Sequence, residues 1–303
     1  MTVELTPAPE RTTWRSLPPL ALVPIAAVVW WVVGFLPWIL DGLGPDVPAG
    51  ASSPVFAIPL YAGHVGELVV GAGLGGVAAG LLTLCGTGPR TLRAAACAVG
   101  VTGAVFITVL QSRSAVNGFT FLRPDTRITN GLSVVVILTA LVGLGLGLLA
   151  LVGRIGVGLA LAAVAGAVPS WLLSVHMAIG VNDLGSAQVV TDVSRWGGAA
   201  VLAFALVVIG MQPALRLVAW PGAVLVAWFV GPTITAASYM EVFLRPGMGL
   251  PDLWGEPFSA AADVWRLSAS PDLRPLASWI TAIVVAAAYA GWRTRSLSRA
   301  PAP

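Results

Sequence analysis

Eight apolar stretches, separated by breaks that carry arginine, constrain the fold of this 303-residue chain more than any other feature. A helix needs roughly 20 residues to cross the hydrocarbon core of a bilayer, and each stretch comes close to that length. The pattern predicts an all-α, polytopic membrane protein: a bundle of eight transmembrane helices in four up-down hairpins. The expected spans are residues 20–40, 61–85, 94–111, 132–152, 155–177, 197–212, 217–240 and 276–292.

Composition agrees with a membrane protein. Charged residues make up 10% of the chain, whereas a soluble domain carries roughly 25%. All 16 basic residues are arginine, which together with abundant alanine, glycine, valine and proline indicates a GC-rich genome of the actinobacterial kind. Because the arginines are scattered singly and form no basic cluster, the composition does not predict nucleic-acid binding.

The connections between the stretches alternate in length, so long loops lie on one face and tight turns on the other. The long connections are residues 41–60, 112–131, 178–196 and 241–275. In the last of these, residues 257–267 are expected to form a short helix at the outer interface, because proline suits a first helical turn and apolar residues follow it. The division into regions is a polar tail at 1–16, a membrane domain at 17–292 and an arginine-bearing tail at 293–303.

Arginine distribution predicts the orientation. The tight-turn face, with both termini, has nine arginines and the long-loop face has seven, although the tight-turn face is about half as long. Its arginine density is therefore roughly double, and the positive-inside rule assigns the denser face to the cytoplasm. We expect a multi-pass protein of the plasma membrane with both termini cytoplasmic.

Glycine and proline spacing gives expectations for packing. Glycines four residues apart in the second stretch match the GxxxG pattern of close helix contacts, and three glycines at alternate positions in the fourth stretch are expected to serve packing too. The seventh stretch carries Pro221 and Pro232, which favour a kink or tilt. Phe-Leu-Arg-Pro at 121–124 and again at 243–246 is a weak internal echo, of the kind a duplication leaves. The glycines are Gly71, Gly75, Gly76 and Gly80, and Gly143, Gly145 and Gly147.

Glu67 is the most informative polar residue, because it lies inside the second apolar stretch. A charged side chain at the centre of a span costs about 3 kcal/mol on insertion scales and usually faces a cavity or a partner. We therefore expect Glu67 to be buried against other spans. His64 precedes it by three residues, so both side chains project from one helix face. The pair is suited to relaying a proton, binding a cation or holding a polar headgroup; the alternative is a structural tie, such as a salt bridge to Arg113.

Other polar residues fall near the same outer ends of the spans, and we expect them to line an outward-opening vestibule. The alternative is ordinary anchoring at the interface. The inner halves of the spans have no ionisable residue at depth, which argues against an ion channel or a proton-coupled transporter. The candidate residues of this polar outer cavity are His64, Glu67, Gln111, Arg113, His176, Arg195, Tyr239 and Glu241.

The chain shows no Walker, HExxH, CxxC or G-x-S-x-G motif, so no cofactor or metal is expected. The leading hypothesis is a non-catalytic protein of the cell envelope that binds a lipid, a small ligand or a membrane-protein partner through its outer face. One alternative is an intramembrane enzyme on a lipid or isoprenoid substrate, with Glu67 as general acid or base and His64 beside it. Another is a permease subunit.

Overall fold

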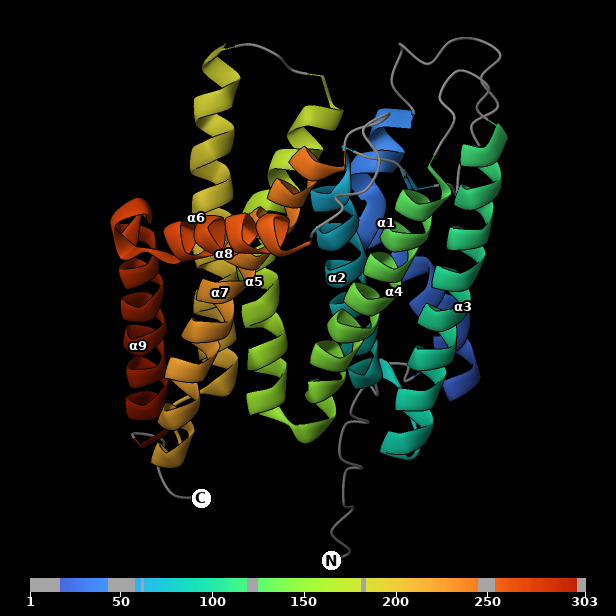
Figure 1. Cartoon of the computed structure of the whole chain (residues 1–303). Coiled ribbons are helices and arrows are strands. Elements are labelled where there is room, and N and C mark those ends of the chain that lie inside the picture. The colour runs from blue at the N-terminus through green and yellow to red at the C-terminus, as the bar shows by residue number, and fades with distance from the viewer. Residues whose placement is uncertain are drawn as a thin grey trace, which may run out of the picture.

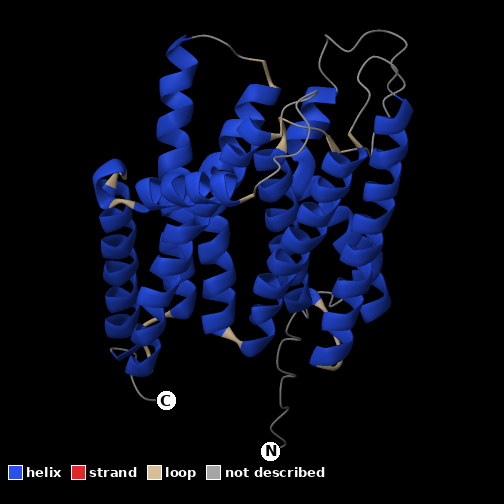
Figure 2. Ribbon diagram, viewed as in Figure 1, coloured by secondary structure: helices blue, strands red, loops and turns tan. Residues whose placement is uncertain are grey.

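The computed structural model describes residues 17–42, 58–60, 63–118, 125–180, 184–244 and 254–298. Regular structure in these residues is helical, as Figure 2 shows, and eight helices are long and apolar enough to cross a membrane. The prediction of an all-α, multi-pass fold is therefore confirmed. The long helices are α1 (Pro19–Gly42), α2 (Val65–Leu81), α3 (Arg90–Gly118), α4 (Thr126–Leu148), α5 (Arg154–Ala178), α6 (Leu184–Ile209), α7 (Ala219–Tyr239) and α9 (Leu276–Ser298).

The remaining α-helix, α8 (Gly255–Ala269), confirms the short helix expected within the longest connection. Figure 1 shows it lying across the direction of the other helices, beside α7 and above the start of α9. It is held to α7 by Trp265, whose ring stacks on Phe229 at 5.3 Å and whose Nε1 donates to the Thr233 hydroxyl at 3.2 Å. Its outward side carries the exposed pair Asp263–Arg266. That ion pair favours a position at the membrane interface over one in hydrocarbon, as expected for an amphipathic helix.

Two of the long connections are shorter than the sequence predicted. Helix α3 continues to Gly118, and α6 begins at Leu184 where the expected sixth span began at 197. The extra residues of α6 mix polar and apolar side chains, among them Gln188, Asp192 and Arg195, so an apolar-stretch criterion misses them. They are helical nonetheless, and Asp192 and Arg195 face each other one turn apart on the helix surface.

The helices form two halves with the same order of neighbours. In the first half α1 packs against α2 and α3, and α2 packs against α4; in the second, α5 packs against α6 and α7, and α6 against α9. This recurrence is what a four-plus-four duplication would produce. The halves differ at one edge. The backbones of α3 and α4 approach each other closely, whereas those of α7 and α9 stand farther apart and meet through side chains, with the rings of Trp228 and Trp279 edge-on at 5.2 Å.

Helix α2 lies between α1 and α4, and glycines make both contacts close. On one side, Gly71 and Gly75 lie against the backbone of α1; on the other, Gly76 and Gly80 lie against that of α4. A Cβ at Gly80 would stand 2.7 Å from the Gly147 Cα, closer than packed atoms approach. The GxxxG interpretation is confirmed, because small residues let helix backbones meet where no hydrophobic effect drives them together.

A helix break occurs in α1 and not in α7, where the prolines favoured one. Helix α7 runs unbroken through Pro232, while Phe35 in α1 has non-helical backbone angles (φ −108°, ψ 20°). Pro37 explains the position of the break, since it has no N–H to donate to the carbonyl of Val33. The indole Nε1 of Trp171, on α5, donates to that carbonyl at 3.0 Å instead. One hydrogen bond thus satisfies the broken helix and ties the two halves together.

Candidate functional site

The N-terminus of α2 brings three of the predicted site residues together. His64 Nδ1 lies 2.9 Å from a carboxylate oxygen of Glu67, and the ring of Trp38 meets the His64 ring edge-on at 5.9 Å. Glu241, which follows α7, accepts a hydrogen bond of 2.8 Å from the backbone N–H of Gly66. Both carboxylates therefore lie at the positive end of the helix dipole, where negative charge is stabilised.

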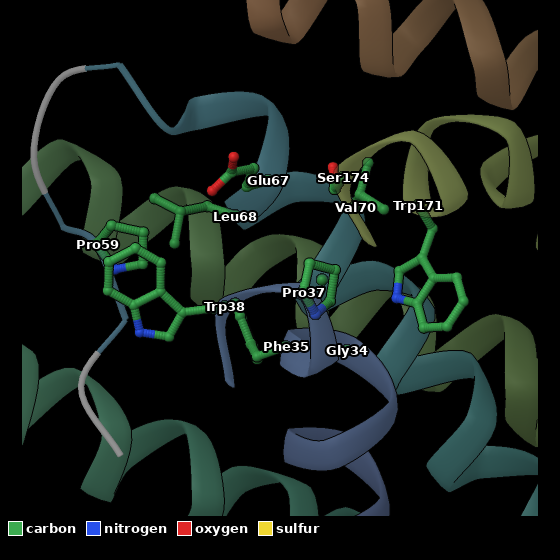
Figure 3. A pocket seen from close by; sticks show the side chains of 11 residues that line it. Gly34, Phe35, Pro37, Trp38, Pro59, Glu67, Leu68, Val70, Trp171 and Ser174 are labelled. Atoms are coloured by element: carbon green, nitrogen blue, oxygen red, sulfur yellow. The ribbon is translucent and has the colours of Figure 1, made fainter. Parts of the chain in front are cut away.

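The expectation that Glu67 is buried against other spans is wrong. Helix α2 begins at Val65, so Glu67 stands in the first turn and its side chain is 47% exposed. The carboxylate therefore avoids the desolvation that a deep position would impose. Figure 3 shows it at the edge of a pocket whose other walls include Pro37 and Trp171. This pocket measures about 20 Å³, which is room for about one water molecule and not for a substrate.

The other predicted residues do not line this pocket. Arg195 lines a separate cavity in the second half, while Gln111, Arg113, His176 and Tyr239 line none of the three cavities described here. Tyr239 packs edge-on against Phe243 at 5.9 Å, as an interfacial aromatic residue would. The Gln111 Oε1 is buried and has no hydrogen-bond partner within the described residues. A vestibule lined by all eight candidates stays a prediction.

The cavity that Arg195 lines is the best candidate site, and we call it the outer cavity. It occupies about 460 Å³ between α5, α6 and α7 and the start of α9, on the side of the protein where α8 lies, which is the side expected to face outward. Its volume falls within the range of small-molecule sites, roughly 300–1,000 Å³. Small and apolar residues form part of the wall, and hydroxyl groups and two arginines form the rest. The apolar part includes Ala165, Ala199, Leu202 and Ala227; the polar part is Ser170, Thr191, Ser194, Arg195, Thr235, Ser268, Arg274 and Ser278.

Arg274 is the residue that sequence reasoning missed. It lies between α8 and α9, with its guanidinium carbon 4.6 Å from the ring centre of Trp228 and 5.9 Å from that of Trp279. Its Nε donates to the Ser268 carbonyl at 3.0 Å. In the sequence it is one of several loop arginines. One feature of the sequence distinguishes it: Arg274 stands just before a span whose fourth residue is Trp279. This feature is informative only when α7 is known to be adjacent, because Trp228 of α7 forms the other part of the aromatic contact.

A third cavity is almost wholly apolar. It measures about 580 Å³ and runs between α2, α4, α5 and α7, where the two halves meet. Threonine hydroxyls at Thr139 and Thr233 are its polar lining side chains, and Thr233 is already bonded to Trp265. In a bilayer, a groove of this lining is solvated by acyl chains and offers nothing to orient a polar ligand.

No family model, curated protein or solved structure matches the chain. The arrangement of its own side chains is therefore the basis for any functional proposal.

Proposed function

We propose that the chain is a non-catalytic binding protein of the cell envelope that holds a membrane lipid or similar amphiphile in its outer cavity. The observation that carries this proposal is the cavity's two-part lining, with apolar residues on some walls and arginines and hydroxyls on others. A lining of that kind suits a molecule with a polar head and an apolar tail.

The alternatives have less support. An intramembrane enzyme that used Glu67 and His64 would need substrate space beside the carboxylate, and the pocket there holds about 20 Å³. A permease would need polar lining continuing to the inner face. Within the described residues, the polar lining of the outer cavity comes from the outer halves of the helices, and the adjoining groove is apolar.

Filling the outer cavity should remove the lipid. Ala199 is buried on α6 and lines the cavity, whereas the next residue, Ala200, is exposed and does not line it. Ala199→Phe is expected to lose most of the lipid that co-purifies in mild detergent, because the ring occupies the apolar part, and Ala200→Phe is the matched control. Ser194→Trp, at the polar wall, tests the same point without touching the helix core. Native mass spectrometry counts the bound lipid. Equal lipid in folded samples of all three variants and the wild type would exclude the cavity as the site.

We also propose, from the arginine distribution, that both termini lie in the cytoplasm, and native cysteines test this. Cys85 is exposed beside the turn between α2 and α3, while Cys97 is buried. A membrane-impermeant maleimide is expected to leave the wild type unlabelled in intact cells and to label it after permeabilisation. Gln188→Cys, at the exposed outer end of α6, should be labelled in intact cells. Labelling of the wild type before permeabilisation would invert the orientation.

A further inference from the structure

Arg274 is held in place before any ligand arrives. The guanidinium lies over Trp228, whose own Nε1 donates to the Ala269 carbonyl at 3.1 Å, so the aromatic platform is itself fixed. Gly231, one turn along α7, leaves the space that the guanidinium uses: a Cβ there would stand 3.2 Å from Nη2. A planar cation held on an aromatic face loses little conformational freedom when it binds a second group.

The charge of Arg274 has no counter-ion among the described residues. The ion pairs found there involve His64, Arg195 and Arg266, and the nearby Asp272 is exposed without forming one. Arg274 is itself half-buried, and this burial lowers the pKa of its guanidinium from the usual value. Cation–π contact offsets part of the cost of burying a charge. An anion would offset more, because buried charges in proteins are paired.

The remaining hydrogen-bonding capacity of Arg274 is unused. Guanidinium has five N–H donors, and within the described residues only Nε has an acceptor. The two Nη groups belong to a side chain that lines the outer cavity. Arg195 lines the same cavity from α6, and its pairing with Asp192, at 3.8 Å between exposed side chains, is loose. Two arginines and one such carboxylate leave the site with net positive charge.

We propose that the outer cavity selects an anionic headgroup, a phosphate or a carboxylate, and that Arg274 is its principal contact. This inference rests on the proposed lipid-binding function and specifies its ligand. The planar guanidinium fits the paired oxygens of either group in a bidentate arrangement. The hydroxyl of Ser170 lines the same cavity and supplies a further donor. The apolar residues beyond them take the start of the tail.

The test compares two arginines that differ in position and not in charge. Arg274→Gln removes the cavity cation, and Arg266→Gln removes an exposed cation of α8 that is absent from the cavity. Purified protein is titrated with phosphatidylglycerol, phosphatidylcholine, oleate or inorganic phosphate, and native mass spectrometry measures occupancy. We expect the wild type and Arg266→Gln to prefer phosphatidylglycerol over phosphatidylcholine about tenfold, and Arg274→Gln to lose that preference, because charge-assisted hydrogen bonds are lost. Arg274→Lys, which keeps the charge without the planar fork, should retain part of it.

Each other outcome contradicts a definite part of the inference. If both glutamine variants lose the preference for phosphatidylglycerol equally, the preference reflects general attraction of anionic lipid to the positively charged surface. An unchanged preference in Arg274→Gln would exclude Arg274 as the contact. Inorganic phosphate that saturates the site as readily as the lipid would make the ligand a free anion. If Ala199→Phe abolishes lipid binding while Arg274→Gln keeps its preference, the headgroup inference fails and the proposed function stands. If Ala199→Phe binds like the wild type, the proposed function fails.

Discussion

Replacing Gly76 with valine is expected to separate α2 from α4 and to prevent recovery of folded protein. A Cβ at Gly76 would lie 2.7 Å from the Leu144 nitrogen and 3.0 Å from the Gly143 carbonyl carbon. These are backbone atoms, which cannot turn aside as a flexible side chain does. Overpacking typically lowers the free energy of unfolding by about 1–3 kcal/mol. Because rigid backbone lies on both sides of this contact, we expect a loss of about 3 kcal/mol or more. The α2–α4 contact is the most extensive between helices in the described chain, so its loss affects the whole first half.

Gly145→Val is the matched control for Gly76→Val. Gly145 lies on α4 between Gly143 and Gly147, but a Cβ there would meet nothing within 4 Å. The change of residue type is the same, so differences in helix propensity cancel. The control should show the melting temperature and the monodisperse yield of the wild type in detergent, while Gly76→Val yields aggregate. Similar losses in both variants would show that glycine content, and not helix contact, governs stability.

These glycines show how far the sequence predicts this fold. Spacing of four residues in an apolar stretch indicates a close contact, and the structure confirms this for Gly71 and Gly76. Spacing alone does not tell which glycine faces a neighbour, so Gly145 could not be separated from Gly143. The apolar spans follow from local composition and were predictable, although two of the long connections are shorter than expected. The partner of each helix face depends on contacts between residues far apart in the chain.

The candidate site illustrates the same limit. Glu67 was expected to be buried because its neighbours are apolar, yet the start of α2 at Val65 places it in an exposed first turn. The desolvation cost of a carboxylate depends on its position relative to the helix end, and not on the hydrophobicity of its neighbours in sequence. Arg274 was overlooked for the converse reason. In the sequence it is one of several loop arginines, and much of its burial arises from Trp228 and Gly231, more than forty residues earlier.

Replacing Trp171 with phenylalanine is expected to destabilise the protein by about 1–3 kcal/mol, the cost of leaving a buried polar group unsatisfied. The group is the Val33 carbonyl. Pro37 has no N–H to donate to it, and the Trp171 indole donates instead. The hydrogen bond is partly buried and the pocket beside Trp171 has room for about one water molecule, so the cost is expected near the lower end of that range. Phenylalanine keeps an aromatic ring in the interface between α1 and α5 while removing the N–H. Thermal or denaturant unfolding in detergent measures the loss.

A second substitution separates the hydrogen bond from the change in side-chain size. Pro37→Ala restores a backbone N–H four residues after Val33, where a regular helix would donate to that carbonyl. In the Pro37→Ala background, Trp171→Phe should therefore cost clearly less than in the wild type, because α1 now satisfies its own carbonyl. Loss of indole volume is common to both backgrounds and cancels in the double-mutant cycle. Equal costs in both backgrounds would mean that packing, and not the hydrogen bond to Val33, accounts for the contribution of Trp171. The cycle thus measures how strongly a proline-induced break in one half of the protein depends on a side chain from the other.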